Sequence, residues 1–203
     1  MVTIINYGMS NIRSIFKKFQ RMNIPCKISS NKDDIKSAEK LILPGVGHFE
    51  NGMKNLSNLG LIPVLNHKVI YENTPILGIC LGAQLFCKHS EEGNVNGLRW
   101  IDAKVVRFDI SDRIRYKVPH IGWNTVNIVN SNKLDSVISK KNEFYFIHSY
   151  HLKSNNKNNI WMKSKYEYEF VSAIHRDNIY GTQFHPEKSH EIGYKLLKKF
   201  AEL

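Results

Sequence analysis

A cysteine lies between two glycines in Gly78-Ile-Cys-Leu-Gly82, where an apolar strand is expected to end and a helix to begin. This spacing is typical of a nucleophile elbow, a sharp strand-to-helix turn that lifts a reactive side chain out of a sheet. The helix N-terminus favours the thiolate, and the backbone N–H of Leu81 can point at a developing oxyanion. The segment predicts Cys80 as a nucleophile, with a buried structural cysteine as the alternative.

A cysteine nucleophile needs a base, and His185-Pro-Glu187 offers one. His185 follows a predicted strand, Pro186 ends that strand, and Glu187 lies two residues beyond the histidine. A carboxylate there can accept the N–H of the far ring nitrogen, which fixes the tautomer and favours the imidazolium. Alone, the segment could be a turn with a solvated charge. Together with Cys80, it predicts a nucleophile, base and orienting carboxylate for acyl transfer.

A second glycine-rich turn, Pro44-Gly-Val-Gly47, follows another buried apolar strand. Glycines allow backbone N–H groups to approach a substrate closely, as an oxyanion requires. A plain turn is the alternative that this motif leaves open.

The elements that must position these groups alternate between strand and helix in the first part of the chain. Strands are expected at 2–6, 26–29, 41–47 and 75–80, and helices at 10–22, 52–71 and 81–89. Such alternation predicts a mostly parallel sheet covered by helices on both faces, in an α/β fold.

The pattern changes near residue 90 to strands separated by polar loops, and the chain closes with a helix over 190–200. The strands are expected at 104–108, 123–129, 144–148, 160–162, 171–175 and 179–184. No linker separates the two parts, so we expect one domain over 1–203.

Composition narrows the class of protein. The 203 residues carry a formal net charge of +11, but the basic residues are scattered and form no nucleic-acid motif. No apolar run approaches the roughly 18 residues of a membrane span, and the N-terminus lacks a signal peptide. The three cysteines form no CxxC pair, so neither zinc nor a disulfide framework is expected. We therefore expect a cytoplasmic protein without a metal or a nucleic-acid partner.

Longer strings then carry a resemblance to a known family. They are Asn6-Tyr-Gly-Met-Ser-Asn11, Leu41-Ile-Leu-Pro-Gly-Val-Gly47, Gly78-Ile-Cys-Leu-Gly82, Ser90-Glu-Glu-Gly93, Pro119-His-Ile-Gly-Trp-Asn124, Tyr145-Phe-Ile-His-Ser-Tyr150 and Gln183-Phe-His-Pro-Glu-Lys-Ser189. In this order they resemble the class I (triad) glutamine amidotransferases, and among these the glutaminase subunits of imidazole glycerol phosphate synthase, the HisH type. The resemblance implies a flavodoxin-like sheet with an additional antiparallel β portion in the second half.

The resemblance also implies roles for individual residues. Cys80, His185 and Glu187 match the triad. Gly47 and Leu81 match the oxyanion donors, after the Val46–Gly47 peptide reorients. The glutamine-binding positions are Gln84, His148, Ser149 and Tyr150. Three positions match those that face a partner subunit or its gate: Asn11, Trp123 and Lys188, with core packing as the alternative for Trp123. No cofactor is implied.

The implied activity is hydrolysis of L-glutamine to glutamate and ammonia, with the ammonia passing to a HisF-type (β/α)₈-barrel cyclase subunit in a heterodimer. There it would serve imidazole glycerol phosphate and AICAR formation in histidine biosynthesis. The strings Gly97-Leu-Arg-Trp-Ile-Asp-Ala103, Ser149-Tyr-His151 and Lys188-Ser-His190 also resemble a paralogue that supplies ammonia for surface-polysaccharide sugars. A cysteine peptidase of the elbow type and a non-enzymatic basic binding module are the remaining alternatives.

Overall fold

The computed structural model describes residues 1–9, 12–139 and 141–203. Asn11, one of the predicted partner positions, therefore lies outside the described residues, as do the first two residues of the helix expected at 10–22.

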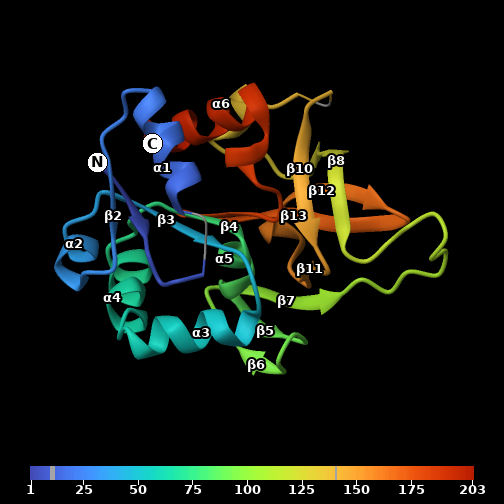
Figure 1. The fold of residues 1–203 in the computed structure, drawn as a ribbon, viewed down its shortest axis with the longest axis horizontal. Coiled ribbons are helices and arrows are strands. Elements are labelled where there is room, and N and C mark those ends of the chain that lie inside the picture. The colour runs from blue at the N-terminus through green and yellow to red at the C-terminus, as the bar shows by residue number, and fades with distance from the viewer. Residues whose placement is uncertain (10–11, 140) are drawn as a thin grey trace.

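Five parallel strands form one half of a large sheet (Figure 1). They follow the order β2-β1-β3-β4-β14. Their bounds are β1 (Val2–Ile5), β2 (Cys26–Ser29), β3 (Lys40–Gly45), β4 (Ile76–Cys80) and β14 (Ile179–Thr182). All four residues of β1 and of β14 and all five of β4 are buried, as expected when helices cover both faces of a parallel sheet.

Helices cover the two faces of this parallel half. On one face lie α1 (Ile12–Arg21) and α6 (His190–Ala201), whose apolar side chains Phe19, Leu197 and Phe200 are buried. The other face is covered by α2 (Lys32–Lys36), α3 (Phe49–Asn58), α4 (Ile62–Asn66), the π-helical segment His67–Tyr71 and α5 (Leu81–Leu85). Two buried cores result, one on each face of the sheet.

The second half of the chain extends the sheet in antiparallel fashion beyond β14. There, β13 (Tyr168–Arg176) pairs with β14, and the sheet continues through β11 (Tyr150–Ser154), β7 (Ile101–Arg107), β5 (Cys87–Ser90) and β6 (Val95–Asn96). Only the β5–β7 pair in this extension is parallel among the described residues. The other edge of β13 pairs with β12 (Ile160–Tyr166), and β12 in turn pairs with β9 (Asn127–Ile128).

A separate two-stranded sheet joins β8 (His120–Thr125) to β10 (Glu143–His148). Short 3₁₀ turns cover Asp135–Val137, Lys157–Asn159 and Pro186–Lys188. The mixed sheet, its flanking helices and its antiparallel extension confirm the predicted fold class.

Several predicted elements were wrong in extent. The helix expected at 81–89 ends at Leu85, because Cys87–Ser90 forms β5 and pairs with β7. The helix expected at 52–71 is interrupted at Gly60, which has φ +61 and so cannot continue a right-handed helix. The strand expected at 123–129 divides into β8 and β9, which belong to different sheets. Both α2 and β11 were missed.

None of the described helices is long and apolar enough to cross a membrane.

Candidate active site

The turn at Cys80 has the backbone of a nucleophile elbow. Cys80 is the last residue of β4 and has φ 53 and ψ −112, which few residues other than glycine adopt. A Cβ on Gly82 would lie 1.7 Å from the carbonyl oxygen of Leu43, and one on Gly78 would lie 2.7 Å from the backbone nitrogen of Ala83. The two glycines therefore let α5 begin directly against the neighbouring strands, and this contact holds the turn at Cys80 in its strained conformation.

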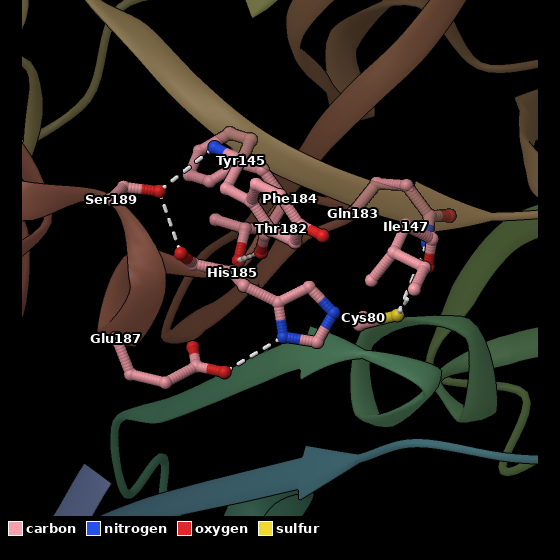
Figure 2. Close-up of polar contacts among 9 residues, drawn as sticks. All are labelled: Cys80, Tyr145, Ile147, Thr182, Gln183, Phe184, His185, Glu187 and Ser189. Carbon is pink, nitrogen blue, oxygen red and sulfur yellow. Dashed lines mark hydrogen bonds and ion pairs between the residues drawn. The ribbon is translucent and has the colours of Figure 1, made fainter. Parts of the chain in front are cut away.

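His185 lies directly beyond β14, the strand next to β4. Its Nδ1 is 2.7 Å from Oε1 of Glu187, and both side chains are almost completely buried (Figure 2). A carboxylate only accepts, so Nδ1 carries the proton of this hydrogen bond. The 3₁₀ turn at Pro186–Lys188 brings the carboxylate back to the ring.

The backbone of His185 is fixed from two directions. Its N–H donates to the carbonyl of Tyr145 in β10 over 2.9 Å. Its carbonyl accepts a hydrogen bond of 2.6 Å from Oγ of Ser189, which in turn accepts the N–H of Tyr145 over 3.0 Å. Ser189 thus ties β10 to the loop that carries His185 and Glu187 (Figure 2).

The other ring nitrogen of His185, Nε2, lies on the side of Cys80 in Figure 2 and has no hydrogen-bond partner among the described residues. Burial opposes a positive charge on this ring. The interaction with the sulfur of Cys80 and, after it, the hydrogen bond to Glu187 outweigh that effect and raise the pKa of His185 to about 10. The arrangement therefore favours a protonated His185 beside Cys80.

Among the described residues, the sulfur of Cys80 makes hydrogen-bond contacts with the carbonyl oxygen of Ile147 at 3.9 Å and with Nε2 of Gln183 at 3.6 Å. Sequence reasoning did not single out Gln183. The available signal was a polar amide within a run of buried residues, two positions before His185.

The predicted glutamine-binding residues lie together beside Cys80. Gln84 is buried in α5 and donates to the carbonyl of Tyr150 over 3.1 Å. His148, at the end of β10, donates from Nδ1 to the same carbonyl over 2.8 Å. Ser149 and Tyr150 are half-buried, and the Ser149 carbonyl accepts the N–H of Phe108.

His148 is packed against a second buried histidine. Nδ1 of His120 lies 3.1 Å from Nε2 of His148, and both rings contact Phe108. Burial and the charge of His120 lower the pKa of His148, and burial lowers that of His120 to about 4. Both rings are therefore neutral near pH 7. His120 is 3% exposed and therefore lies in the interior, not at the surface.

The glycine-rich turn after β3 lies beside the elbow, since Gly45 pairs with Cys80 across the two strands. Beyond Gly45 the chain becomes exposed: Val46 is 50% exposed, and Gly47 has φ +120. The N–H of Val46 donates to the carbonyl of Met9 over 2.5 Å. Leu81, in contrast, is buried at the first position of α5. Because the N–H of Val46 is bonded to Met9, it cannot donate to a substrate in this conformation.

Trp123 and Lys188, the two predicted partner positions that the structure describes, lie near His185 and outside the core. Trp123, on β8, is 43% exposed and stacks on the ring of His190 with a centroid distance of 4.7 Å. This exposure argues against core packing. Nζ of Lys188 lies 5.5 Å from the ring centroid of Tyr145, which also contacts Trp123.

Other candidate features lie elsewhere. A cavity of about 1280 Å³ lies between the end of β7, the loop that follows it and strands β11 to β13, and none of the predicted triad lines it. Within the described ranges, no group of three or more His, Cys, Asp or Glu side chains could hold a metal ion.

The sequence as a whole matches a known family. Residues 3–202 match the family model for glutamine amidotransferase class-I. The chain is 49% identical over 200 residues, 98% of each chain, to imidazole glycerol phosphate synthase subunit HisH 2 of Methanococcus maripaludis. It is 43% identical over the full length of both chains to the Pseudomonas aeruginosa protein of the same name. These names do not favour the sugar-amidation alternative.

Solved structures agree in fold. A structure described as a glutamine amidotransferase superposes with a TM-score of 0.76 over 100% of both chains, at 15% identity. The glutaminase domain of CTPS from Trypanosoma brucei gives a TM-score of 0.64 over 99% of this chain and 93% of that one, at 18% identity. The match over residues 3–202 and the full-length relatives show that the chain belongs to the class-I glutamine amidotransferase family.

Proposed function

We propose that this chain hydrolyses the side-chain amide of glutamine, with Cys80 as nucleophile, His185 as acid and base, and Glu187 as the group that orients the histidine. The observation that carries the proposal is the buried hydrogen bond between His185 and Glu187, behind a ring whose free nitrogen lies on the side of Cys80.

The reaction is acyl transfer in two halves. In the first, the Cys80 thiolate forms a bond to Cδ of glutamine, and the carbonyl becomes an oxyanion. As the C–N bond breaks, the His185 imidazolium gives its proton to the departing nitrogen, and ammonia leaves a γ-glutamyl thioester behind. In the second, neutral His185 takes a proton from water, the hydroxide attacks the thioester, and the C–S bond breaks. The product leaves as glutamate after its new carboxylic acid loses a proton to solvent, and the thiolate and the imidazolium are restored.

The oxyanion needs two donors, and the proposal assigns them to Leu81 and to the turn at Val46 and Gly47. The Leu81 N–H lies at the start of α5, next to the nucleophile. The Val46 N–H is held by the carbonyl of Met9. The N–H of the Val46–Gly47 peptide is that of Gly47, and we infer that this peptide reorients before catalysis and presents the Gly47 N–H to the oxyanion. Such a step makes turnover depend on what contacts the exposed turn.

Glutamine recognition is proposed for Gln84, His148, Ser149 and Tyr150. Both N–H groups of the Gln84 amide are used within the chain, so its carbonyl oxygen is the part left to accept from the α-ammonium of glutamine. Since burial keeps His148 neutral, it does not repel that ammonium.

The relatives are named as subunits of imidazole glycerol phosphate synthase. We propose that this chain pairs with a HisF-type (β/α)₈-barrel cyclase and delivers ammonia to it for imidazole glycerol phosphate and AICAR formation. The exposed ring of Trp123 and the nearby Lys188 support a contact surface beside His185. Asn11 is assigned to the same surface by resemblance alone. A cytoplasmic location follows from this biosynthetic role and agrees with three unpaired cysteines.

The test is glutamate release measured with the barrel subunit from the same genome, with and without its phosphorylated, nucleotide-derived substrate. We expect hydrolysis that depends on the barrel subunit, rises when the substrate is present, and is lost in Cys80→Ala. Cys26→Ser, which changes a half-buried cysteine in β2, is the matched control and should retain activity. Full activity in Cys80→Ala would contradict the proposed chemistry, and no response to the barrel or its substrate would contradict the proposed partner.

A further inference from the structure

A chain of buried amides leads from the substrate-binding segment to the sulfur of Cys80. Nε2 of Gln84 donates to the carbonyl of Tyr150 over 3.1 Å and to Oε1 of Gln183 over 3.0 Å. Nε2 of Gln183 then lies 3.6 Å from Sγ of Cys80. Gln183 is completely buried and Gln84 nearly so.

The direction of this chain is fixed by the backbone at its far end. A carbonyl oxygen only accepts, so the Gln84 atom that faces Tyr150 must be its nitrogen. That nitrogen also faces Gln183, so the nearer atom of Gln183 must be its oxygen. The NH₂ group of Gln183 is then the part directed at the sulfur. Gln183 therefore presents a donor, and not an acceptor, to Sγ of Cys80.

A donor at this position favours a negative sulfur over a neutral one. The other polar neighbour of Sγ is the carbonyl of Ile147, which can only accept and so favours the protonated thiol. Gln183 is uncharged and sits two residues before His185, so one segment places both the donor to the sulfur and the acid–base group beside it. Hydrogen bonds to ionised groups are stronger than those between neutral ones.

We propose that Gln183 is a positioning residue that holds Cys80 as a thiolate aimed at the substrate, with Gln84 fixing the orientation of the Gln183 amide. The proposal rests on the proposed glutaminase chemistry and deepens it. It also gives Gln84 a second task, because the residue that contacts glutamine would also orient the group that stabilises the nucleophile.

The test compares variants of Gln183 by two readouts. The first is the pH dependence of Cys80 alkylation by iodoacetamide, mapped to the Cys80 peptide by mass spectrometry. The second is kcat and KM for glutamine, measured with the barrel subunit. Gln183→Met keeps the length of the side chain but removes the donor without changing any charge. Gln183→Glu keeps an acceptor for Gln84 and places a carboxylate against the sulfur.

We expect the alkylation midpoint to move to higher pH in Gln183→Met and further in Gln183→Glu. We expect kcat to fall roughly 10- to 100-fold in Gln183→Met, with a smaller change in KM, since hydrogen bonds to charged groups contribute on that scale. The other titratable groups around Cys80 are His185 with Glu187, His148 and Tyr7, and neither variant alters them. Gln20→Met, an exposed glutamine of α1, is the matched control.

An unchanged alkylation midpoint and kcat in Gln183→Met would overturn the proposal, as would a Gln183→Glu midpoint at or below the wild-type value. If Gln183→Met does not fold, Gln183→Glu and Gln84→Met decide by the same readouts. Loss of turnover in Cys80→Ala beside wild-type behaviour in Gln183→Met would leave the glutaminase proposal standing and remove only this inference. Full turnover in Cys80→Ala would remove both.

Discussion

The two sides of Cys80 differ in how far their groups are already bonded within the chain. On the side of β14, His185, Glu187 and Gln183 are buried, and the His185–Glu187 and Gln183–Cys80 contacts are formed. On the side of β3, Val46 and Gly47 are exposed, and the N–H of Val46 is bonded to Met9 and not directed at the nucleophile. The proposed nucleophile and base are thus assembled, while in the proposed oxyanion turn the N–H of Val46 is bonded to Met9.

This difference suggests how the reaction is restrained. A preassembled thiolate and imidazolium do little to an amide unless the tetrahedral intermediate is stabilised, because oxyanion stabilisation is a large part of acyl-transfer catalysis. An exposed turn can be moved by a partner more easily than a buried triad can. We therefore infer that a partner acts on turnover through the turn, whereas the elbow stays unchanged. Alkylation of Cys80 reports on the elbow, and glutamine turnover reports on both sides.

The largest effect is expected from Cys80→Ala, which removes the nucleophile itself. Turnover with the barrel subunit should fall by at least about 10³-fold, since loss of a covalent nucleophile leaves only binding and oxyanion effects. The unfolding midpoint should change little because the side chain is small. A residual rate within tenfold of wild type would contradict the assignment.

The elbow itself is tested by Gly82→Ala. The new Cβ would lie 1.7 Å from a backbone oxygen that cannot move freely, so we expect a loss of about 3 kcal/mol or more in the free energy of unfolding. Gly52→Ala in α3 is the control, because its nearest neighbours are the flexible methyl groups of Leu85 at 3.3 Å. Urea unfolding should separate the two variants, and equal stabilities would show that the close contact at Gly82 is not needed.

The turn is tested by Gly47→Ala, which disfavours the positive φ of this residue and misplaces its N–H. Turnover with the barrel subunit should fall on the order of 10²-fold, the scale of one lost oxyanion donor. Alkylation of Cys80 should keep its wild-type pH profile. If alkylation and turnover fall together, the two sides of Cys80 are not independent, and the comparison fails.

A smaller effect is expected from Glu187→Gln, which removes the charge that helps to raise the pKa of His185 to about 10. That contribution is lost, so the pKa of His185 falls, while the contribution of Cys80 remains. His185 must be protonated to release ammonia, so activity is lost as pH rises through its pKa. The alkaline limb of kcat/KM should therefore move to lower pH, with a loss of roughly tenfold at neutral pH. Glu191→Gln, at an exposed glutamate of α6, should leave the limb in place.

The smallest effect is expected from Trp123→Ala. The ring is 43% exposed and stacks on His190, so its loss should cost little stability. Affinity for the barrel subunit should fall about tenfold, as for a moderate aromatic contact in an interface. Calorimetric titration of the two subunits measures this affinity. Unchanged affinity beside reduced stability would mean that Trp123 has a structural role only.

The elbow side could be predicted from sequence because its signals are local. The glycines two positions before and after Cys80 are required because backbone atoms lie too close for a side chain there. Glu187 reaches His185 within one short turn. The buried strands were found because parallel strands covered on both faces read as continuous apolar runs. Most of the wrongly predicted element boundaries lie where strands pair with distant segments. The residues of β5, for example, have no sequence pattern typical of a strand, and they form one by pairing with β7.

The state of the turn and the role of Gln183 could not be predicted for the same reason. Four elements, α1, β2, α2 and β3, lie between Met9 and Val46, and the amide chain joins α5 to the residue that follows β14. Neither has a spacing that could be recognised in the sequence. Polar groups in buried positions were the one available signal, and Gln84 was found only through the family resemblance.

Trapping the thioester tests the chemistry at Cys80 more directly than any of these variants. The chain, its barrel partner and glutamine are mixed, quenched in acid within one turnover, digested and analysed by mass spectrometry. We expect a γ-glutamyl group on the peptide that contains Cys80, accumulating more in a variant that slows deacylation and absent in Cys80→Ala. A γ-glutamyl group on Cys26 or Cys87, or full ammonia release by Cys80→Ala, would contradict the assignment of Cys80 as the nucleophile.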